Sequence, residues 1–349
     1  MKIGLTYDLK ATVETHAGGP EDEAEEYDPP DTVDALAAEI EALGHRVVRL
    51  GGGRDLLEAV AHGPRSTALP VDLVFNVAEG RGVYRSREAQ VPSVLEMLGV
   101  PYSGSDPLTL ALCLDKPLTK RIALSAGVAT PCYQVIERIE DLDCLREGAP
   151  RFPVVVKPAF EGSSKGIRLT SRVDRREDLC QPVIAVLQGY RQPALVEEFI
   201  AGTEITVGVV GNRPPQVVGV MEVVPHLHQD GNFMYTLEVK RDWQRLVSYR
   251  CPPHLPAACL REIEGMALTL FQVLGCRDMA RLDFRVDQAQ RPYFLEANPL
   301  PGLSPVYSDL PILSRLAGWS YRQLIETILN ASLDRYEFRS FQRAHRPGL

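Results

Sequence analysis

The first third of the chain alternates short apolar runs with an amphipathic segment. The runs at 2–7, 46–50 and 71–77 have the length and composition of strands, and apolar residues recur at helical spacing over 33–43. Strands that alternate with helices are typical of an open α/β layer. We therefore expect residues 1–113 to form an N-terminal α/β domain.

A second unit begins at Asp115, which can cap a helix that has Pro117 in its first turn. Three β-type runs follow, at 152–157, 167–170 and 194–199. A helix is expected from about 174 to 187, between the last two of these runs. This order predicts a small α+β domain over residues 114–200.

The remainder of the chain combines a hairpin with two helices. A polar turn joins two β-type runs within 204–224, and a helical pattern covers 260–274. Ser320 and Gln323 have the spacing of a capping box at the start of a final helix. We assign residues 201–349 to a third domain, so the chain as a whole is predicted to be α/β (α+β) with three domains.

Composition narrows the class of protein. The 349 residues are 45% hydrophobic and carry a net charge of −8, and the seven cysteines show no Cys-x-x-Cys spacing, which excludes a disulfide-stapled scaffold. The sequence has neither a long apolar stretch nor the features of a secretory signal, so we expect a cytoplasmic protein without a membrane segment. The negative charge also disfavours a nucleic-acid partner, which needs a broad basic surface.

The acidity is local. Eleven acidic residues and no Lys or Arg lie between Glu14 and Glu41, and the rest of the chain carries a net charge of +3. Residues 14–27 lack any hydrophobic period and predict a long loop after the first strand, a position where loops commonly carry function. The total charge therefore does not exclude a phosphate-bearing ligand at a basic site.

The segment 280–298 alternates apolar and polar residues on both sides of a polar turn, which predicts a hairpin. With a four-residue loop at 288–291, the pairs of opposed residues are Arg281 with Asn298, Asp283 with Glu296, and Val286 with Tyr293. The polar face then carries Arg281, Asp283, Glu296 and Asn298. The apolar face carries Leu282, Phe284, Val286, Tyr293, Leu295 and Ala297.

Two opposed carboxylates on this face point to a metal ion. Their Cβ atoms would lie about 4.5 to 5.5 Å apart, where like charges repel unless a cation lies between them. Asp283, Glu296 and the amide oxygen of Asn298 are ligands of the kind that Mg²⁺ prefers, with Mn²⁺ as an alternative. The other interpretation is an ordinary hairpin with a solvated polar face. The following Pro-Leu-Pro-Gly at 299–302 favours the site, because it cannot extend the strand and can turn backbone amides toward the same face.

Several elements suit a phosphate, although each has a simpler explanation. Lys157 ends a buried-type strand, and the loop 161–166 (EGSSKG) that follows would let backbone amides approach an anion. The loop is not a Walker motif, and a turn beside a snorkelling lysine would explain it equally. The alternative for Lys116 is that it is one of several exposed lysines on a capped helix. The alternative for Glu197 and Glu198 is that they are solvated acids at the end of a strand.

The order of these motifs resembles the ATP-grasp superfamily, and specifically the D-alanine–D-alanine ligases, from about residue 72 to 335. The motifs that carry the resemblance are 99–105 (GVPYSGS), 114–120 (LDKPLTK), 156–159 (VKPA), 162–164 (GSS), 196–204 (VEEFIAGTE), 279–283 (MARLD) and 296–302 (EANPLPG). The resemblance implies a three-domain ATP-grasp fold with an N-terminal pre-ATP-grasp domain, and ATP bound between the central and C-terminal domains.

It also implies roles for individual residues. On the nucleotide side, Lys116, Lys157 and Lys240 would contact phosphates, Ser163 and Ser164 would cover them, Glu197 would lie by the adenine with Glu198 and Ile200, and Glu204 by the ribose. Asp283, Glu296 and Asn298 would hold Mg²⁺, in agreement with the hairpin argument. In catalysis, Arg281 and a backbone N–H near Gly302 would stabilise the tetrahedral oxyanion, with Lys240 and Ser163 at the transferred phosphate.

The sequence departs from the family pattern at the motifs that would bind the amino-acid substrates. The family's glutamate-bearing signature after the first strand is absent, and residues 8–14 read DLKATVE instead. A His-Gly motif is replaced by Glu79-Gly80, and a Lys-Tyr pair by Lys240-Arg241. Glu79 and Glu88 are our candidates for binding a substrate ammonium group, with solvated surface acids as the alternative. Arg241 is a candidate for a second substrate carboxylate, and Gly302 and Ser308 complete the expected substrate side.

The leading hypothesis is an ATP-dependent ligase that joins two small amino acids through an acyl phosphate. D-alanyl-D-alanine, a peptidoglycan precursor for the cell wall, is the default product. One alternative is an amino-acid or peptide ligase of a biosynthetic or tailoring pathway with another substrate. An alternative of a different class is a nucleotide-binding module without catalysis. The expected partners are small-molecule amino acids, and the resemblance adds a homodimer as the expected assembly.

Overall fold

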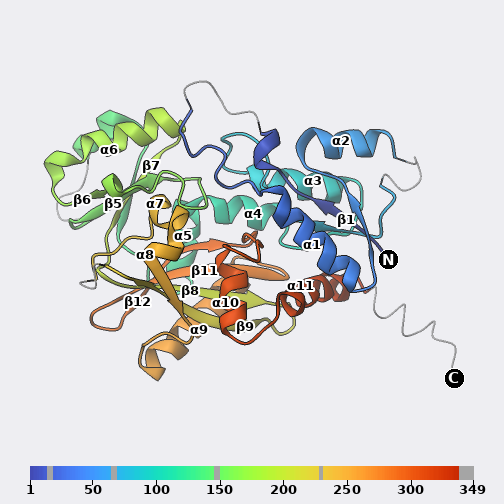
Figure 1. Cartoon of the computed structure of the whole chain (residues 1–349). Coiled ribbons are helices and arrows are strands. Elements are labelled where there is room, and N and C mark those ends of the chain that lie inside the picture. Colours follow the sequence, from blue (N-terminus) through green and yellow to red (C-terminus); the bar gives the residue numbers. More distant parts are fainter. Residues whose placement is uncertain (14–18, 64–68, 145–149, 228–230, 338–349) are drawn as a thin grey trace.

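The computed structural model describes residues 1–13, 19–63, 69–144, 150–227 and 231–337. In Figure 1 the N-terminal elements lie at the right, a sheet of antiparallel strands lies at the upper left, and a second antiparallel sheet lies below it. Within the described residues, no helix is both long and apolar enough to cross a membrane.

The N-terminal part is built on a parallel sheet in the order β2-β1-β3. Its strands are β1 (Lys2–Thr6), β2 (Arg46–Arg49) and β3 (Leu73–Asn76). Parallel neighbours need crossover connections, which are made by the helices α1 (Pro30–Ala42) and α2 (Gly53–Ala61), and α3 (Gln90–Met97) follows β3. The carboxyl ends of β1 and β3 lie at one edge, so Asp8 and Glu79 emerge close together.

The central sheet is antiparallel, in the order β4-β7-β5-β6. Its strands are β4 (Tyr133–Ile136), β5 (Val154–Pro158), β6 (Arg172–Val173) and β7 (Ala194–Glu198). Two helices, α4 (Pro107–Leu114) and α5 (Lys116–Ser125), precede it, and Asp115 caps α5 through the Leu118 amide, as predicted.

Two expectations for the central part were wrong. The strand expected at 167–170 is a turn that ends in a 3₁₀ segment, Leu169–Ser171. The Ser171 hydroxyl accepts a hydrogen bond from the Arg168 amide and donates one to the Gly166 carbonyl, which closes the turn. The helix expected over 174–187 is α-helical only in α6 (Cys180–Ala185), and it continues as a π-helical turn, Val186–Tyr190.

The C-terminal sheet has the order β10-β9-β8-β11-β12. Its strands are β8 (Gly202–Val210), β9 (Gln216–Pro225), β10 (Val247–Arg250), β11 (Met279–Asp287) and β12 (Pro292–Asn298). Its helices are α7 (Leu237–Arg241), α8 (Trp243–Leu246), α9 (Ala257–Val273), α10 (Asp309–Leu316) and α11 (Tyr321–Arg335). The predicted β8–β9 hairpin, the long helix and the Ser320–Gln323 capping box are confirmed.

The β11–β12 register is confirmed at the end that matters for the site and wrong near the turn. Arg281 pairs with Asn298 and Asp283 with Glu296, as predicted. An irregularity between Asp283 and Phe284 then shifts the register, so Val286 pairs with Pro292 instead of Tyr293. As a result Phe294 is buried and Leu295 is not, contrary to the predicted faces. A bulge of this kind leaves one residue unpaired and bends the strand.

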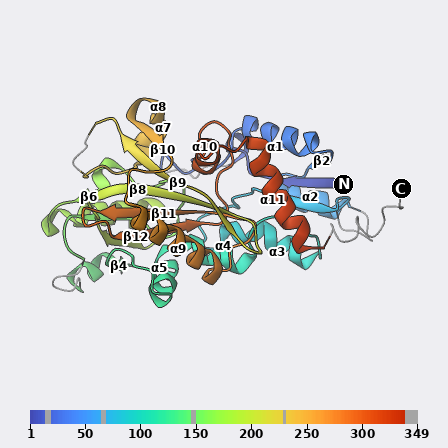
Figure 2. The same ribbon diagram turned by 90° about the horizontal axis from the view of Figure 1, so that it is seen from below.

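The chain ends pack together. The last helix, α11, contributes apolar residues to the same core as α1 and β1, and Figure 2 shows it lying beside these N-terminal elements. Arg335 at its end donates to the Asp278 carboxylate at 2.7 Å and to the carbonyls of Tyr102 and Gly104. Asp278 in turn accepts from the Gly104 amide at 2.8 Å. The N-terminal layer is thereby joined to the C-terminal sheet, which gives the site its walls.

Candidate active site

Asp283 and Glu296 face each other across β11 and β12. The Asp283 carboxylate accepts hydrogen bonds from Thr206 at 2.9 Å and from the Asn298 amide at 3.3 Å. Burial and the neighbouring Glu296 carboxylate raise the pKa of Asp283 against the opposing effect of Arg281. The opposed acids are therefore close enough to repel, as the predicted hairpin required.

Cations surround the outer carboxylate. Lys116 Nζ lies 3.3 Å from Glu296 Oε2. Burial alone would raise the pKa of Glu296, but the charges of Lys116, Lys157, Arg281 and Lys240 outweigh it and hold that pKa well below its usual range. Glu296 is therefore an anion at neutral pH, as a ligand for a hard cation must be.

Arg281 lies on the same strand as Asp283. Its guanidinium contacts Asp283 at 2.9 Å, Glu296 at 3.8 Å and Asp309 at 3.3 Å. Burial would lower the pKa of Arg281, but these carboxylates raise it overall, so its charge is permanent. A fixed cation at this place is suited to stabilise an oxyanion that forms beside the acids.

The oxygen donors of the hairpin fit Mg²⁺ by their chemistry. Asp283 and Glu296 are directly paired, Asn298 lies two residues after Glu296 on the same strand, and all three offer hard oxygen ligands. Among the described residues, no group of three or more His, Cys, Asp or Glu side chains is gathered as a metal site, so any ion here would take its remaining ligands from water or phosphate. The assignment of Asp283, Glu296 and Asn298 to Mg²⁺ stays a prediction.

The Gly/Ser loop after β5 has the strained backbone expected of an anion-binding turn. Ser163 and Ser164 have φ of 48° and 59°, in the left-handed region that side chains rarely adopt. The Ser164 hydroxyl donates to the Tyr235 carbonyl at 3.2 Å, so the loop contacts the segment before α7. The loop is thereby tied to the segment that leads into α7, the helix that carries Lys240.

Glu197 lies between two lysines on the nucleotide side. Its carboxylate contacts Lys157 and, at 2.8 Å, Lys120. Burial would raise the pKa of Glu197, but the two lysines lower it overall. Lys120 was missed as a site residue, although it ends the 114–120 motif, because a lysine on a short helix gives no sign that it is buried. The predicted contact of Glu197 with adenine stays a prediction.

The remaining nucleotide-side residues follow Glu197 along β7 and β8. Glu198 ends β7, and Ile200 lies in the connection to β8, both half-buried. Glu204 on β8 accepts from Arg285 at 3.0 Å, and burial raises its pKa. Lys240 on α7 lies 5.2 Å from the centre of the Tyr235 ring, and its charge helps to lower the pKa of Glu296.

Arg241 contacts the N-terminal loop. Its guanidinium donates to Glu25 at 3.0 and 3.2 Å, and Lys10 approaches the same carboxylate at 3.2 Å. Arg168 lies 3.3 Å from Glu238 on α7 and 3.5 Å from Asp22. The acidic loop is therefore joined by ion pairs to the elements that cover the nucleotide side. The predicted contact of Arg241 with a substrate carboxylate would need the pair with Glu25 to open.

Two predicted substrate-side acids lie close together and repel. Glu88 is 9% exposed, and burial raises its pKa to about 8. Burial and the charge of Glu88 also raise the pKa of Glu79 well above its usual range. A small cavity of about 20 Å³ is lined by Glu88, Lys116, Glu161, Glu296 and Asn298, so Glu88 faces the reaction centre.

Gly302 and Ser308 are in close contact. A Cβ atom at residue 302 would lie 2.7 Å from the Ser308 hydroxyl oxygen, so only glycine fits there without movement. The Ser308 hydroxyl accepts from the Ser304 amide at 3.0 Å, and Asp309, the partner of Arg281, follows it in α10. This turn lies against Arg281, on the side expected for substrate.

A buried ionic cluster was missed by the sequence reasoning. Arg87 donates to Glu26 at 2.6 and 2.7 Å and to Glu161 at 3.1 Å, and Lys165 lies 2.6 Å from Glu161 and 3.3 Å from Glu26. The Gly162 amide also donates to Glu26 at 2.6 Å. The acidic loop thus places Glu26 on the Gly/Ser loop. Only the local acidity around Glu14–Glu41 hinted at this, since the segment has no period.

Known proteins resemble the chain in sequence and in fold. The family described as D-ala D-ala ligase C-terminus matches residues 123–330. "Uncharacterized protein y4sG" of Sinorhizobium fredii is 36% identical over 307 residues, which are 87% of this chain and 88% of that protein. The D-alanine–D-alanine ligase of Moorella thermoacetica is 32% identical over 307 residues, or 86% and 93%. The crystal structure of D-alanine–D-alanine ligase from Bacillus anthracis complexed with ATP has a TM-score of 0.70 at 23% identity, covering 97% of this chain and 99% of that chain.

The two antiparallel sheets, the lysines between them and the Gly/Ser loop are those of the ATP-grasp fold, and the predicted fold class is confirmed. Proteins of this class that match the chain are ATP-dependent ligases that form peptide bonds. The chain belongs to the D-alanine–D-alanine ligase family. The boundaries at 113/114 and 200/201 stay a prediction.

The buried cluster makes a prediction about stability. Arg87→Ala leaves Glu26 and Glu161 with one cation fewer, so we expect the free energy of unfolding to fall by about 3 to 5 kcal/mol. Urea unfolding followed by circular dichroism measures this, with exposed Arg261→Ala on α9 as a matched control that should change it by less than about 0.5 kcal/mol. A change below about 1 kcal/mol in Arg87→Ala would show that the cluster contributes little.

The raised pKa of Glu88 predicts a pH dependence. Its pKa is about 8 in the folded protein and 4.5 in the ordinary case, so its contribution to stability is full below pH 4.5 and is lost as pH rises through 8. Glu88→Gln removes this pH-dependent contribution, because an amide does not titrate. We expect the thermal midpoint of the wild type to fall more than that of Glu88→Gln between pH 5 and 9, by differential scanning fluorimetry. Parallel curves for the two proteins would contradict the assignment.

Proposed function

We propose that this protein is an ATP- and Mg²⁺-dependent ligase that joins the carboxylate of one small amino acid to the amine of another. The observation that supports it most directly is the Asp283–Glu296 pair with Asn298, faced by Lys116 and Lys240. Oxygen ligands beside converging lysines suit a bound Mg²⁺ and the triphosphate of ATP. The family of the chain agrees with this chemistry.

The reaction begins with activation of a carboxylate. A carboxylate oxygen of the first substrate attacks the γ-phosphorus of ATP, ADP leaves, and an acyl phosphate forms. Charge spreads over the transferred phosphoryl oxygens, and Lys116 and Lys240 are placed to neutralise it. Bound Mg²⁺ supplies further neutralisation and orients the phosphates. The Ser163–Ser164 loop and its contact with Tyr235 exclude water, which would otherwise hydrolyse the acyl phosphate.

The second step forms the amide bond. The ammonium group of the second substrate gives a proton to water, and the free amine attacks the acyl carbon, which gives a tetrahedral oxyanion. Arg281 and a backbone N–H near Gly302 stabilise this oxyanion, and such a donor is typically worth about 3 to 4 kcal/mol. Collapse of the intermediate expels phosphate and leaves the peptide bond.

The default product is D-alanyl-D-alanine for the cell wall. A ligase for another amino acid or for a peptide is a second candidate, and it is favoured by the substrate side of the site. Glu79 stands where the family pattern has a histidine, and Arg241 where it has a tyrosine. Burial raises the pKa of Glu79 and of its neighbour Glu88. Ammonium binding would neutralise this pair, which motivates our assignment of Glu79 and Glu88 to the amine. We also propose that the reaction takes place in the cytoplasm and that the protein forms a homodimer.

A substrate screen tests the function. Purified protein is incubated with ATP, Mg²⁺ and pairs of D- and L-amino acids, and phosphate release and product mass are measured. We expect ADP, phosphate and one peptide in equal amounts with at least one pair. If D-alanine alone gives no dipeptide while another pair does, the default product is wrong and the ligase proposal stands. If phosphate release is the same with and without amino acids, the ligase proposal fails.

Glu296→Gln tests the metal side of the site. The variant keeps the size of the side chain but loses the charge that holds Mg²⁺, so we expect turnover to fall at least about 100-fold, with a higher Mg²⁺ requirement. Phosphate release at several Mg²⁺ concentrations measures both effects. Arg291→Gln, at the exposed turn of the same hairpin, is the matched control and should be fully active. Wild-type activity in Glu296→Gln would reject the hairpin site.

A further inference from the structure

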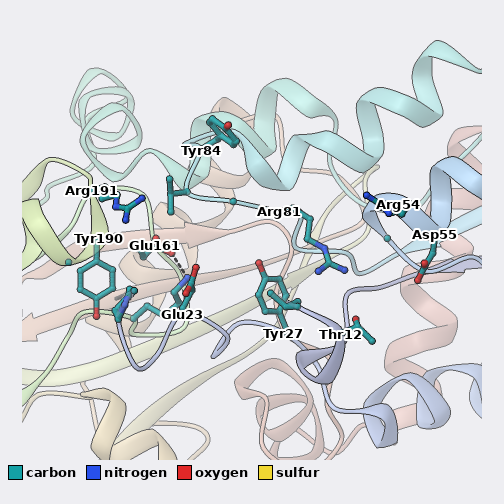
Figure 3. A pocket seen from close by; sticks show the side chains of 18 residues that line it. Thr12, Glu23, Tyr27, Arg54, Asp55, Arg81, Tyr84, Glu161, Tyr190 and Arg191 are labelled. Atoms are coloured by element: carbon teal, nitrogen blue, oxygen red, sulfur yellow. Dashed lines mark ion pairs between the residues drawn. The ribbon is translucent and has the colours of Figure 1, made fainter. Parts of the chain in front are cut away.

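The reaction centre is closed on the side of the acidic loop. Figure 3 shows Glu161 in the wall of a cavity of about 830 Å³ between the N-terminal part and the central sheet. Glu161 also belongs to the buried cluster with Arg87, Glu26 and Lys165, which lies between this cavity and the reaction centre. Arg281 does not line the cavity. It is contacted instead by acids of the C-terminal sheet and of α10.

The guanidinium of Arg281 is held at both of its ends. On one side, Nε and Nη2 donate to the Asp283 carboxylate at 2.9 to 3.2 Å, and Nη2 lies 3.8 Å from Glu296. On the other side, Nη1 lies 3.3 Å from Oδ2 of Asp309. Asp283 and Glu296 are the acids proposed to hold Mg²⁺, whereas Asp309 lies outside that set. The charge of Asp309 is therefore available to Arg281 alone among these three acids.

The packing of α10 fixes the place of Asp309. Asp309 is the first residue of α10 and is 8% exposed, and Leu310 and Leu313 of the same helix are fully buried in the core. Arg281 pairs with Gly208 on β8, and a Cβ atom at residue 208 would lie 2.6 Å from the Leu310 side chain. The helix therefore lies directly on the strand beside Arg281. An acid at the start of a helix packed this closely has little freedom to move away.

Tyr235 connects Asp309 to the elements around the phosphates. Its hydroxyl donates to the Asp309 carboxylate at 3.4 Å and lies 2.6 Å from the hydroxyl of Tyr249 on β10. Its carbonyl accepts from the Ser164 hydroxyl of the Gly/Ser loop at 3.2 Å, and Lys240 Nζ lies 5.2 Å from the centre of its ring. One residue thus contacts the Gly/Ser loop through its backbone and the partner of Arg281 through its side chain.

We propose that Asp309 is a positioning residue that holds Arg281 for the attack of the amine on the acyl carbon, and that Tyr235 links Asp309 to the Gly/Ser loop. The inference rests on the proposed ligase function, because it concerns the second step of that reaction. Only this step places an oxyanion on carbon, where Arg281 acts. Asp309 therefore matters for formation of the peptide bond and little for formation of the acyl phosphate.

Separate measurement of the two steps tests this. The first step is followed with ATP that carries ¹⁸O in the bridge between its β- and γ-phosphorus atoms. When the γ-phosphoryl group is transferred to the carboxylate, the β-phosphate of ADP rotates, and reversal returns the label to a non-bridging position. The second step is followed by the mass of the peptide. The substrate is D-alanine, or the first pair of amino acids that gives a peptide in the screen.

Asp309→Asn keeps the size of the side chain and removes its charge. We expect peptide formation to fall at least about tenfold at saturating substrate, because Arg281 is held less firmly. The movement of the label in ATP should be no slower than in wild type, and the KM for ATP should stay within about threefold. Tyr235→Phe keeps every charge and should show the same split between the two steps with a smaller loss of peptide formation, about threefold.

Glu326→Gln, at an exposed position on the neighbouring helix α11, removes one acid elsewhere and should leave both steps unchanged. Unfolding curves recorded without Mg²⁺ confirm that each variant is folded. Equal losses in both steps in Asp309→Asn would assign it a purely structural role, and unchanged peptide formation would deny it any role; either result overturns the inference. Wild-type behaviour of Tyr235→Phe would overturn the link to the Gly/Ser loop. If wild type itself shows neither label movement nor peptide with any pair, the ligase proposal is what fails.

Discussion

Two carboxylates held opposite each other on neighbouring strands are the constraint on which the site depends. Asp283 and Glu296 repel, and the protein offsets this repulsion with Arg281 on one side and Lys116 on the other. Burying these charges costs free energy, and the pairing of each charge with a partner offsets that cost. An unpaired buried charge would be strongly destabilising. The same cations that stabilise these carboxylates are those that a triphosphate would meet, so stability and ATP binding depend on the same side chains.

A second set of buried charges ties the substrate side to the phosphate side. Glu26 comes from the acidic loop, Arg87 from the N-terminal part, and Glu161 and Lys165 from the Gly/Ser loop region. Arg241 on α7 reaches Glu25 of the same loop. The acidity that gives the chain its negative charge is therefore partly internal. It joins the elements that close the reaction centre, which the net charge alone does not reveal.

Contacts between residues of adjacent strands could be predicted from the sequence, whereas contacts between residues far apart in the sequence could not. Asp283 and Glu296 were placed correctly because alternation along two adjacent strands determines which side chains are opposed. The register beyond Phe284 was wrong because a bulge leaves no mark in an alternating sequence. Glu26 and Arg87 meet across 61 residues through tertiary packing, so no local pattern indicated the contact. Ion pairs of this kind can be identified only when the arrangement of the sheets in space is known.

The central claim is that this site activates a carboxylate by transferring phosphate to it. The most direct measurement follows oxygen: the protein is supplied with ATP, Mg²⁺ and an accepted amino acid labelled with ¹⁸O in its carboxylate, and the released phosphate is analysed by mass spectrometry. Formation and aminolysis of an acyl phosphate predicts one ¹⁸O atom in each phosphate for each peptide bond made. Phosphate without the label, released while peptide forms, would contradict the account.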